Sequence, residues 1–255
     1  MLGAGANPCV RPIGSTACDT ILTQLQRSLD AIAVVAVAPE CAACGGLLHT
    51  VRDGAVCEAC WKAVLAAAPP RAGLGEGRAR TLDALRSISG HEGALRRVIH
   101  ALKYGKRRSV ARPLGRLMRE HAADVLAGAD VAVPVPLHWT RRRERGFNQA
   151  ELLARELGLP VMAALRRTRR TRPQVELPAP DRLTNVAGAF ALRRRDAWRM
   201  RRGRRRHPLA GRTVVLVDDV CTTGATLEAC ARVLEQAGAV SVRAVTAARV
   251  PTPLV

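Results

Sequence analysis

Aromatic residues and lysine are scarce in this sequence of 255 residues. It has one tyrosine, two phenylalanines and three tryptophans, which is too few for a platform that stacks the bases of single-stranded nucleic acid. Lys62, Lys103 and Lys106 are the only lysines among 41 basic residues, so arginine supplies almost all of the net charge of +20. A GC-rich coding bias explains much of this arginine, but the charge attracts polyanions whatever its origin.

The sequence also lacks a long apolar run. The longest unbroken one, residues 31–38, is too short to cross a bilayer, which takes about 20 residues. It does not fit a signal peptide either, because about 30 residues precede it without a compact basic start. We therefore expect a cytoplasmic protein without a membrane span.

Eight cysteines in a protein that is not exported favour metal binding or catalysis over disulfides. Cys41 and Cys44 form one Cys-x-x-Cys pair, and Cys57 and Cys60 form a second pair after 12 intervening residues. Two such pairs complete a tetrahedral thiolate site, so the spacing predicts a zinc ribbon. A redox pair is the alternative, but two matched pairs favour metal. Four protein ligands leave no open position, and the predicted Zn²⁺ is therefore structural.

The chain is predicted to contain two folded parts. We expect residues 1–38 to form a disordered extension and an amphipathic helix, and residues 39–67 to form the zinc ribbon. Proline and glycine mark residues 68–80 as a linker, and residues 81–255 form the larger domain.

Strand and helix patterns alternate in the larger domain with short connections, which predicts a parallel α/β sheet flanked by helices. The strand patterns cover residues 82–88 (an expected edge strand), 131–135, 161–165, 188–192, 213–217 and 241–247. The helical patterns cover residues 95–102, 110–126, 150–157 and 227–234. The run 213–217 consists only of β-branched and aliphatic residues, which is typical of a strand buried on both faces.

Two adjacent carboxylates, Asp218 and Asp219, follow this central strand. The loop after them offers amides and hydroxyls from Thr222, Thr223, Gly224, Ala225 and Thr226. A strand, a small-residue loop and a helix N-terminus together bind phosphate. The loop lacks the ending of a P-loop, and a dinucleotide fingerprint has its acid much further on. Two acids beside a phosphate cradle suit a sugar phosphate.

Other loops are expected at the same edge of the sheet, where α/β proteins bind ligands. Leu137 and His138 are placed to offer backbone amides to a pyrophosphate, and Arg141 and the arginines after it to neutralise it. For His138 a structural role remains equally open. The arginine-rich segment 166–182 is either a lid or a solvated loop.

Two further groups are interpreted as bystanders. His91, His100 and His121 fall on helical segments and are expected to be polar-face or capping residues. The arginine-rich insertion at residues 193–206 is expected to be disordered rather than a dedicated nucleic-acid site.

The order of these motifs carries a resemblance. VVLVDDVCTTGAT resembles the phosphoribosyl-pyrophosphate (PRPP) motif of type I phosphoribosyltransferases. With the cysteine pairs, HEGALRRVIHALKYGKR, RERGFNQ and RLTNVAGAF, it makes residues 38–248 similar to the ComF/GntX family of competence-related phosphoribosyltransferase-like proteins. The N-terminal extension and the insertion at 193–206 depart from the family pattern.

The resemblance implies a type I phosphoribosyltransferase-like domain that binds PRPP with Mg²⁺. Asp218 and Asp219 would hold the ribose hydroxyls near the developing positive charge, and residues 222–226 would hold the 5′-phosphate. This favours a glycosyltransferase of the phosphoribosyltransferase type, although no residue indicates its acceptor. The alternative is a non-catalytic DNA-uptake module that binds single-stranded DNA or a competence helicase. The intact acids and threonines count against a degenerate regulatory site.

Overall fold

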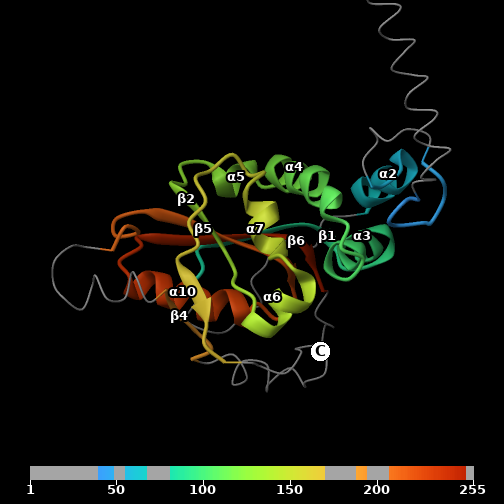
Figure 1. Cartoon of the computed structure of the whole chain (residues 1–255). Coiled ribbons are helices and arrows are strands. Elements are labelled where there is room, and N and C mark those ends of the chain that lie inside the picture. The colour runs from blue at the N-terminus through green and yellow to red at the C-terminus, as the bar shows by residue number, and fades with distance from the viewer. Residues whose placement is uncertain (1–39, 49–54, 68–80, 170–187, 194–206, 251–255) are drawn as a thin grey trace, which may run out of the picture.

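The computed structural model describes residues 40–48, 55–67, 81–169, 188–193 and 207–250. They form a four-stranded sheet in which every neighbouring pair is parallel (Figure 1). Its order is β1 (Ala84–Gly90), β6 (Ser241–Arg249), β5 (Thr213–Cys221) and β2 (Val131–Pro134). The predicted parallel α/β fold is therefore confirmed, and so is the edge position of the first strand.

Helices cover both faces of this sheet. On one side lie α3 (Gly93–Lys103), α4 (Ala111–His121) and α7 (Gln149–Ala154), whose buried residues share one apolar cluster. On the other side lies α10 (Ala225–Gln236) with a second cluster. Figure 1 shows α4 above the sheet and α10 below it. Along β5, Val215 and Val217 pack with the first group, whereas Val214 and Leu216 pack with α10. All four are fully buried, which explains the unbroken aliphatic run in the sequence.

Shorter helices complete the connections. They are α2 (Glu58–Ala66), the 3₁₀ turn η2 (Arg108–Val110), α5 (Ala123–Leu126) and α6 (Trp139–Arg145). The single helix predicted for residues 110–126 is wrong, because Ala122 leaves the helical conformation at φ −113° and ψ 22° and separates α4 from α5. After this break, Val125 packs in the same apolar core as the buried residues of α4.

The strand predicted at residues 161–165 is also wrong. Val161 makes one isolated parallel bridge to Ala132, and the next strand, β3 (Leu165–Arg167), pairs antiparallel with β4 (Phe190–Leu192) in a separate two-stranded sheet. The residues between Val161 and β3 belong to no strand. Ala164, for example, is fully buried in the apolar cluster that includes α10.

The zinc-ribbon segment packs directly on the larger domain. Helix α2 contacts α3, and Cys60 and Val64 belong to the same apolar cluster as Leu95 and Val98. A side-chain hydrogen bond from Arg107 to the carbonyl oxygen of Glu40 adds a polar contact. The linker at 68–80 lies outside the described residues, so the division into domains stays a prediction.

Several other predicted features also lie outside the described residues. These are the N-terminal extension and helix, most of the arginine-rich segment 166–182, and nearly all of the insertion 193–206. Within the described part of the chain, every helix is too short or too polar to span a membrane.

Candidate functional site

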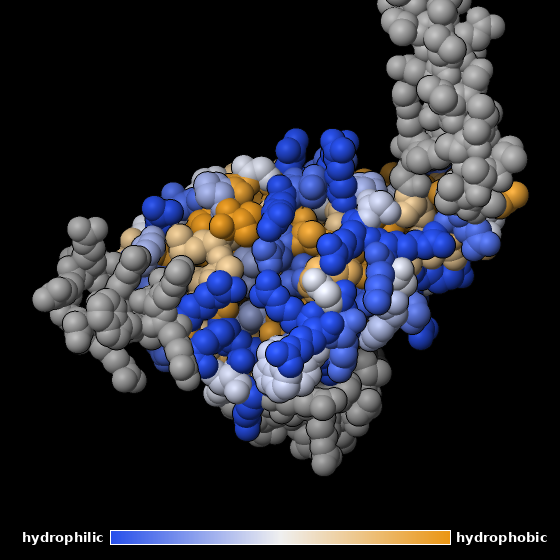
Figure 2. All heavy atoms as spheres, in the orientation of Figure 1, coloured by the Kyte–Doolittle hydropathy of each residue, from blue (hydrophilic) through white to orange (hydrophobic). Residues whose placement is uncertain are grey.

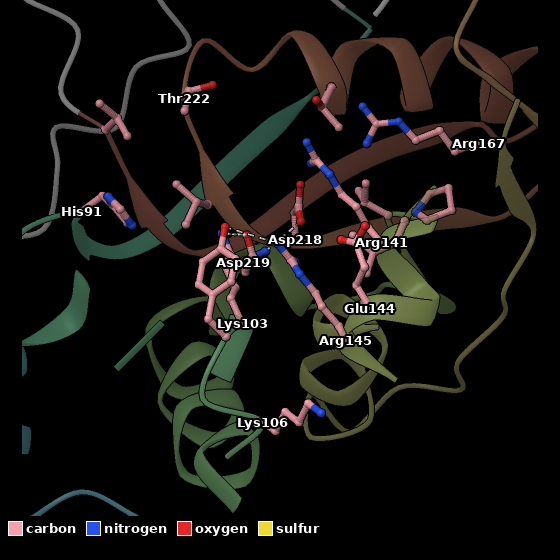
Figure 3. Close-up of a pocket in the computed structure, with 17 residues that line it drawn as sticks. His91, Lys103, Lys106, Arg141, Glu144, Arg145, Arg167, Asp218, Asp219 and Thr222 are labelled. Atoms are coloured by element: carbon pink, nitrogen blue, oxygen red, sulfur yellow. Dashed lines mark hydrogen bonds and ion pairs between the residues drawn. The ribbon is translucent and has the colours of Figure 1, made fainter. Parts of the chain in front are cut away.

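A cavity of about 610 Å³ opens at the carboxyl ends of β2 and β5 (Figure 3). Among the described residues its lining includes five basic and three acidic side chains. The polar residues that line it are His91, Lys103, Tyr104, Lys106, Arg141, Glu144, Arg145, Arg167, Asp218, Asp219, Thr222 and Thr226. The cavity therefore lies where the fold predicts a ligand site, and it carries an excess of positive charge.

Asp218 and Asp219 lie within β5, not in a loop after it. The strand was predicted to end at residue 217, but its pairing with β6 continues through Asp218 to Cys221. Successive side chains of a strand point to opposite faces, so the two carboxylates meet different neighbours. Asp219 faces the layer of α3, and Asp218 faces the layer that carries β3.

Asp219 forms an ion pair with Lys103, the last residue of α3. The Nζ atom of Lys103 lies 2.7 Å from Oδ1 of Asp219, and the two side chains are 19% and 11% exposed. Figure 3 shows Lys103 reaching up from α3 to the acid. This nearly buried pair holds one of the two acids in place before any ligand arrives.

Asp218 has a perturbed acidity. Its Oδ1 accepts a hydrogen bond from the backbone N–H of Asp219 at 2.9 Å. Burial and the charge of Asp219 raise the pKa of Asp218 to about 7, although Lys103 and Arg167 act in the opposite direction. Burial and the charge of Arg141 lower the pKa of Arg167 in turn. Asp218 can therefore exchange a proton near neutral pH, as functional carboxylates often do.

The threonine loop leads into α10 as predicted. Gly224 caps the helix with a left-handed backbone at φ 78°, and a β carbon there would meet no atom within 4 Å. The backbone conformation, not the available space, therefore requires glycine. Thr222 and Thr226 line the cavity, whereas the neighbouring Thr223, Gly224 and Ala225 are not among its described lining residues. The N-terminus of a 12-residue helix thus adjoins the acids.

The expected pyrophosphate loop after β2 is largely the helix α6. Leu137 and Arg141 line the cavity, but the 8% exposed His138 is not among its lining residues. His138 instead caps α6, its Nδ1 accepting from the backbone N–H of Thr140 at 3.4 Å. The helical spacing brings Arg141, Glu144 and Arg145 to one side, where all three line the cavity.

The RERGFNQ motif explains how α6 is held. Gly146 ends the helix with φ 77°. The side-chain nitrogen of Asn148 donates to the carbonyl oxygen of Val135 at 3.0 Å, and its oxygen caps α7 by accepting from Ala150 N at 3.2 Å. The fully buried Gln149 accepts from Arg145 at 3.2 Å. The motif residues after Arg145 therefore position the arginines of α6, and they are not among the described lining residues of the cavity.

Three lining residues at the end of α3 were missed by the sequence interpretation. Lys103, Tyr104 and Lys106 all line the cavity. The guanidinium of Arg145 lies 5.1 Å from the centre of the Tyr104 ring and donates to its hydroxyl at 3.4 Å, which joins α3 to α6. A signal was present, because these positions hold two of the three lysines and the only tyrosine of the chain.

The histidines fall into two groups. His100 on α3 and His121 at the end of α4 are exposed, as expected for polar-face residues. His91 was also expected on a helical segment, but it precedes α3 and lines the cavity. Burial, followed by the charge of Lys103, lowers its pKa. A neutral imidazole therefore stands at one side of the cavity.

Cys41, Cys44, Cys57 and Cys60 form the predicted cluster. Their sulfur atoms all lie within 4.8 Å of one another. The backbone amides of Ala43 and Cys57 donate to the Cys41 sulfur at 3.4 and 3.3 Å. Burial favours the neutral thiol of Cys41, but the backbone amides lower its pKa to about 6. Four converging sulfurs with one stabilised thiolate fit a structural Zn²⁺.

Comparison with known proteins agrees with this arrangement. Residues 143–254 match the family described as Phosphoribosyl transferase domain. The DNA utilization protein YhgH of Escherichia coli (strain K12) is 35% identical over 156 residues, which cover 57% of this chain and 63% of that protein. The chain thus spans less than two thirds of that relative's length.

Two other relatives extend the match. YhgH of Salmonella typhi is 32% identical over 168 residues, covering 62% of this chain and 68% of that protein. Competence protein ComFC of Bacillus subtilis (strain 168) is 37% identical over 120 residues, covering 47% and 44% of the two chains. With its phosphoribosyltransferase-type sheet and its four-cysteine cluster, the chain belongs to the ComF family.

Proposed function

We propose that this protein binds PRPP with Mg²⁺ in the cavity and transfers the phosphoribosyl group to an acceptor. One observation carries this proposal: the acid pair of β5, the N-terminus of α10 and five basic side chains meet in a single cavity. A sugar bearing phosphates at two positions presents hydroxyls and several negative charges, and these are the groups that such a lining binds.

Each part of the ligand has a complementary surface. The 5′-phosphate binds at the N-terminus of α10 with the hydroxyls of Thr222 and Thr226. The ribose hydroxyls donate to Asp218 and Asp219. The pyrophosphate extends toward α6, where Arg141 and Arg145 line the cavity. This orientation places the acids at the anomeric carbon, where positive charge develops.

Mg²⁺ fits this site by its preference for oxygen ligands. Asp218 is a carboxylate whose burial raises its pKa to about 7, so a nearby cation would favour its charged form. Asp218 and the ligand's own oxygens would hold the ion, and Asp219 already has Lys103 as a partner. When bound, Mg²⁺ neutralises charge on the pyrophosphate.

The transfer breaks the bond between the anomeric carbon and the pyrophosphate oxygen, and pyrophosphate leaves with the electron pair. A lone pair of the acceptor forms the new bond to that carbon. The proton that the acceptor releases passes to solvent water, because the Asp218 carboxylate that would hold the ion stays charged. The arginines of α6 stabilise the charge on the leaving group.

Calorimetric titration of PRPP with Mg²⁺ tests the proposal. We expect the wild type to bind and the Asp218→Asn/Asp219→Asn variant to lose binding. Asp130→Asn is the matched control, because Asp130 accepts from Thr213 N at the opposite edge of the sheet. No binding by the wild type, or equal binding by the double variant, would refute the proposed site. Pyrophosphate release in a screen of bases and amines then tests turnover.

A second candidate function is binding of single-stranded DNA in DNA uptake. Two relatives are named DNA utilization protein and competence protein, which supports a role connected with DNA. Hydrophilic side chains cover the face over α6 (Figure 2). On this helix the side chain of Trp139 is 60% exposed, and the guanidinium of Arg143 lies 5.1 Å from the centre of its ring. Such a pair can stack on a base and contact phosphate.

Fluorescence anisotropy with a labelled single-stranded oligonucleotide separates the two functions. The second function predicts binding that weakens with salt and with Arg142→Gln/Arg143→Gln, in a protein that releases no pyrophosphate. Unchanged affinity in this variant would exclude α6 as the DNA-binding surface.

A further inference from the structure

The lysines of this chain are concentrated at the cavity. Arginine fills 38 of the 41 basic positions, so the composition shows a strong preference for arginine wherever a positive charge suffices. Lys62 is exposed on α2 and pairs with Glu58. The other two lysines, Lys103 and Lys106, both line the cavity. Two of the three lysines of the chain therefore line the cavity, beside Arg141, Arg145 and Arg167.

Lys103 is positioned to contact two partners at once. In the described part of the chain, the Asp219 carboxylate is the one hydrogen-bond partner of its ammonium, which has three N–H donors. Its side chain is 19% exposed and that exposed part faces the cavity. Figure 3 shows Lys103 entering from α3 while Arg141 and Arg145 enter from α6. An anion between α3 and α6 would contact cations from both helices.

An arginine at position 103 would act differently. A guanidinium binds a carboxylate through two parallel N–H groups and so uses one acceptor site on each carboxylate oxygen. The ammonium of Lys103 approaches Oδ1 of Asp219 and leaves Oδ2 to accept from another donor. A lysine therefore leaves more of the Asp219 carboxylate free to accept from a ribose hydroxyl than a bidentate arginine does.

We propose that Lys103 bridges Asp219 to the pyrophosphate of the ligand and that lysine serves this position better than arginine. The inference rests on the proposed phosphoribosyl site. Lys103 is then a positioning residue that joins recognition of the ribose to recognition of the leaving group. A ligand without the pyrophosphate does not engage the bridge, so the contribution of Lys103 depends on which ligand is bound.

The test compares PRPP with ribose 5-phosphate, both with Mg²⁺, by calorimetry. Lys103→Met is expected to lose about tenfold more affinity for PRPP than for ribose 5-phosphate, the value of one charged hydrogen bond. Lys103→Arg is expected to weaken the binding of both ligands, because its guanidinium engages both carboxylate oxygens of Asp219. Lys62→Met is the matched control, a lysine exposed on α2, and is expected to bind both ligands as the wild type does.

The outcomes separate this inference from the function on which it rests. Wild-type affinity for PRPP in Lys103→Arg would show that charge alone suffices and would overturn the inference. An equal loss of both ligands in Lys103→Met would also overturn it, since Lys103 would then only support Asp219. If the wild type binds neither ligand, the phosphoribosyl site itself is refuted. Thermal unfolding of each variant shows that the compared proteins are folded.

Discussion

The side-chain amide of Asn148 donates to the carbonyl oxygen of Val135 at 3.0 Å and thereby ties the start of α7 to the end of β2. The segment between these two residues contains the whole of α6, including Arg141 and Arg145. One hydrogen bond thus closes the segment that brings two arginines to the cavity.

Asn148→Ala is expected to destabilise the protein by about 1–3 kcal/mol, because it removes a helix cap and leaves a buried carbonyl unpaired. Urea unfolding measures this change. Asn148→Ser is the matched control, since it keeps a neutral capping oxygen and loses the donor to Val135, and its stability should lie between those of the wild type and Asn148→Ala. Unchanged stability in Asn148→Ala would contradict the role of this contact.

The raised pKa of Asp218 predicts a pH-dependent stability. Because the folded-state pKa of about 7 exceeds that of an ordinary carboxyl, the protonated Asp218 stabilises the folded state at low pH. This stabilisation falls as the pH rises above the ordinary carboxyl pKa of about 4, by up to about 1.4 kcal/mol per pH unit, and is lost once the pH passes about 7.

Asp218→Asn carries no titrating group at this position, so its thermal stability should rise relative to that of the wild type between about pH 4 and about pH 7. Thermal unfolding of both proteins across this pH range measures the difference. A constant difference between the two proteins would refute the raised pKa.

Lys106 has a left-handed backbone at φ 52°, the one non-glycine residue with positive φ in the described segments. This conformation costs an L-residue about 1 kcal/mol, and glycine adopts it freely. Lys106→Gly is expected to be more stable than Lys106→Ala by about 1 kcal/mol in urea unfolding. Both variants lose the ammonium, so both should bind PRPP more weakly than wild type. Greater stability of the alanine variant would contradict the strain.

Removal of a zinc ligand is expected to destabilise the larger domain as well as the zinc ribbon. Cys44→Ser should abolish stoichiometric zinc in metal analysis and lower the thermal midpoint, because α2 packs in the same apolar cluster as α3. Cys18→Ser, which replaces a cysteine that is not one of the four predicted ligands, is the control and should retain zinc. Full zinc content in Cys44→Ser would show that the cluster is not the metal site.

Local patterns were sufficient for parts of this structure. The two Cys-x-x-Cys pairs, the buried run before Asp218 and the glycine that caps α10 are each defined by neighbours in sequence. The end of β5 was predicted wrongly because aspartate disfavours strands, whereas pairing with β6 carries the ladder through both acids to Cys221. Propensity was overridden by a partner strand that follows later in the chain.

The most informative contact of the cavity was beyond local reasoning. Lys103 and Asp219 meet because α3 packs across the sheet and ends beside β5. The two residues are 116 positions apart in the sequence, so no local spacing pattern could predict their contact. Likewise, His138 stood in the expected pyrophosphate loop, but α6 forms there and uses the imidazole as its cap.

The shared apolar cluster of α2 and α3 joins the four cysteines to the helix whose last residue holds Asp219. This packing would couple metal binding at the sulfurs to ligand binding at the cavity, and such a coupling must be reciprocal. Oxidation of the thiolates would loosen the support of α3 and weaken its grip on the anion. Through this packing, the oxidation state of the four cysteines would affect the proposed sugar-phosphate site.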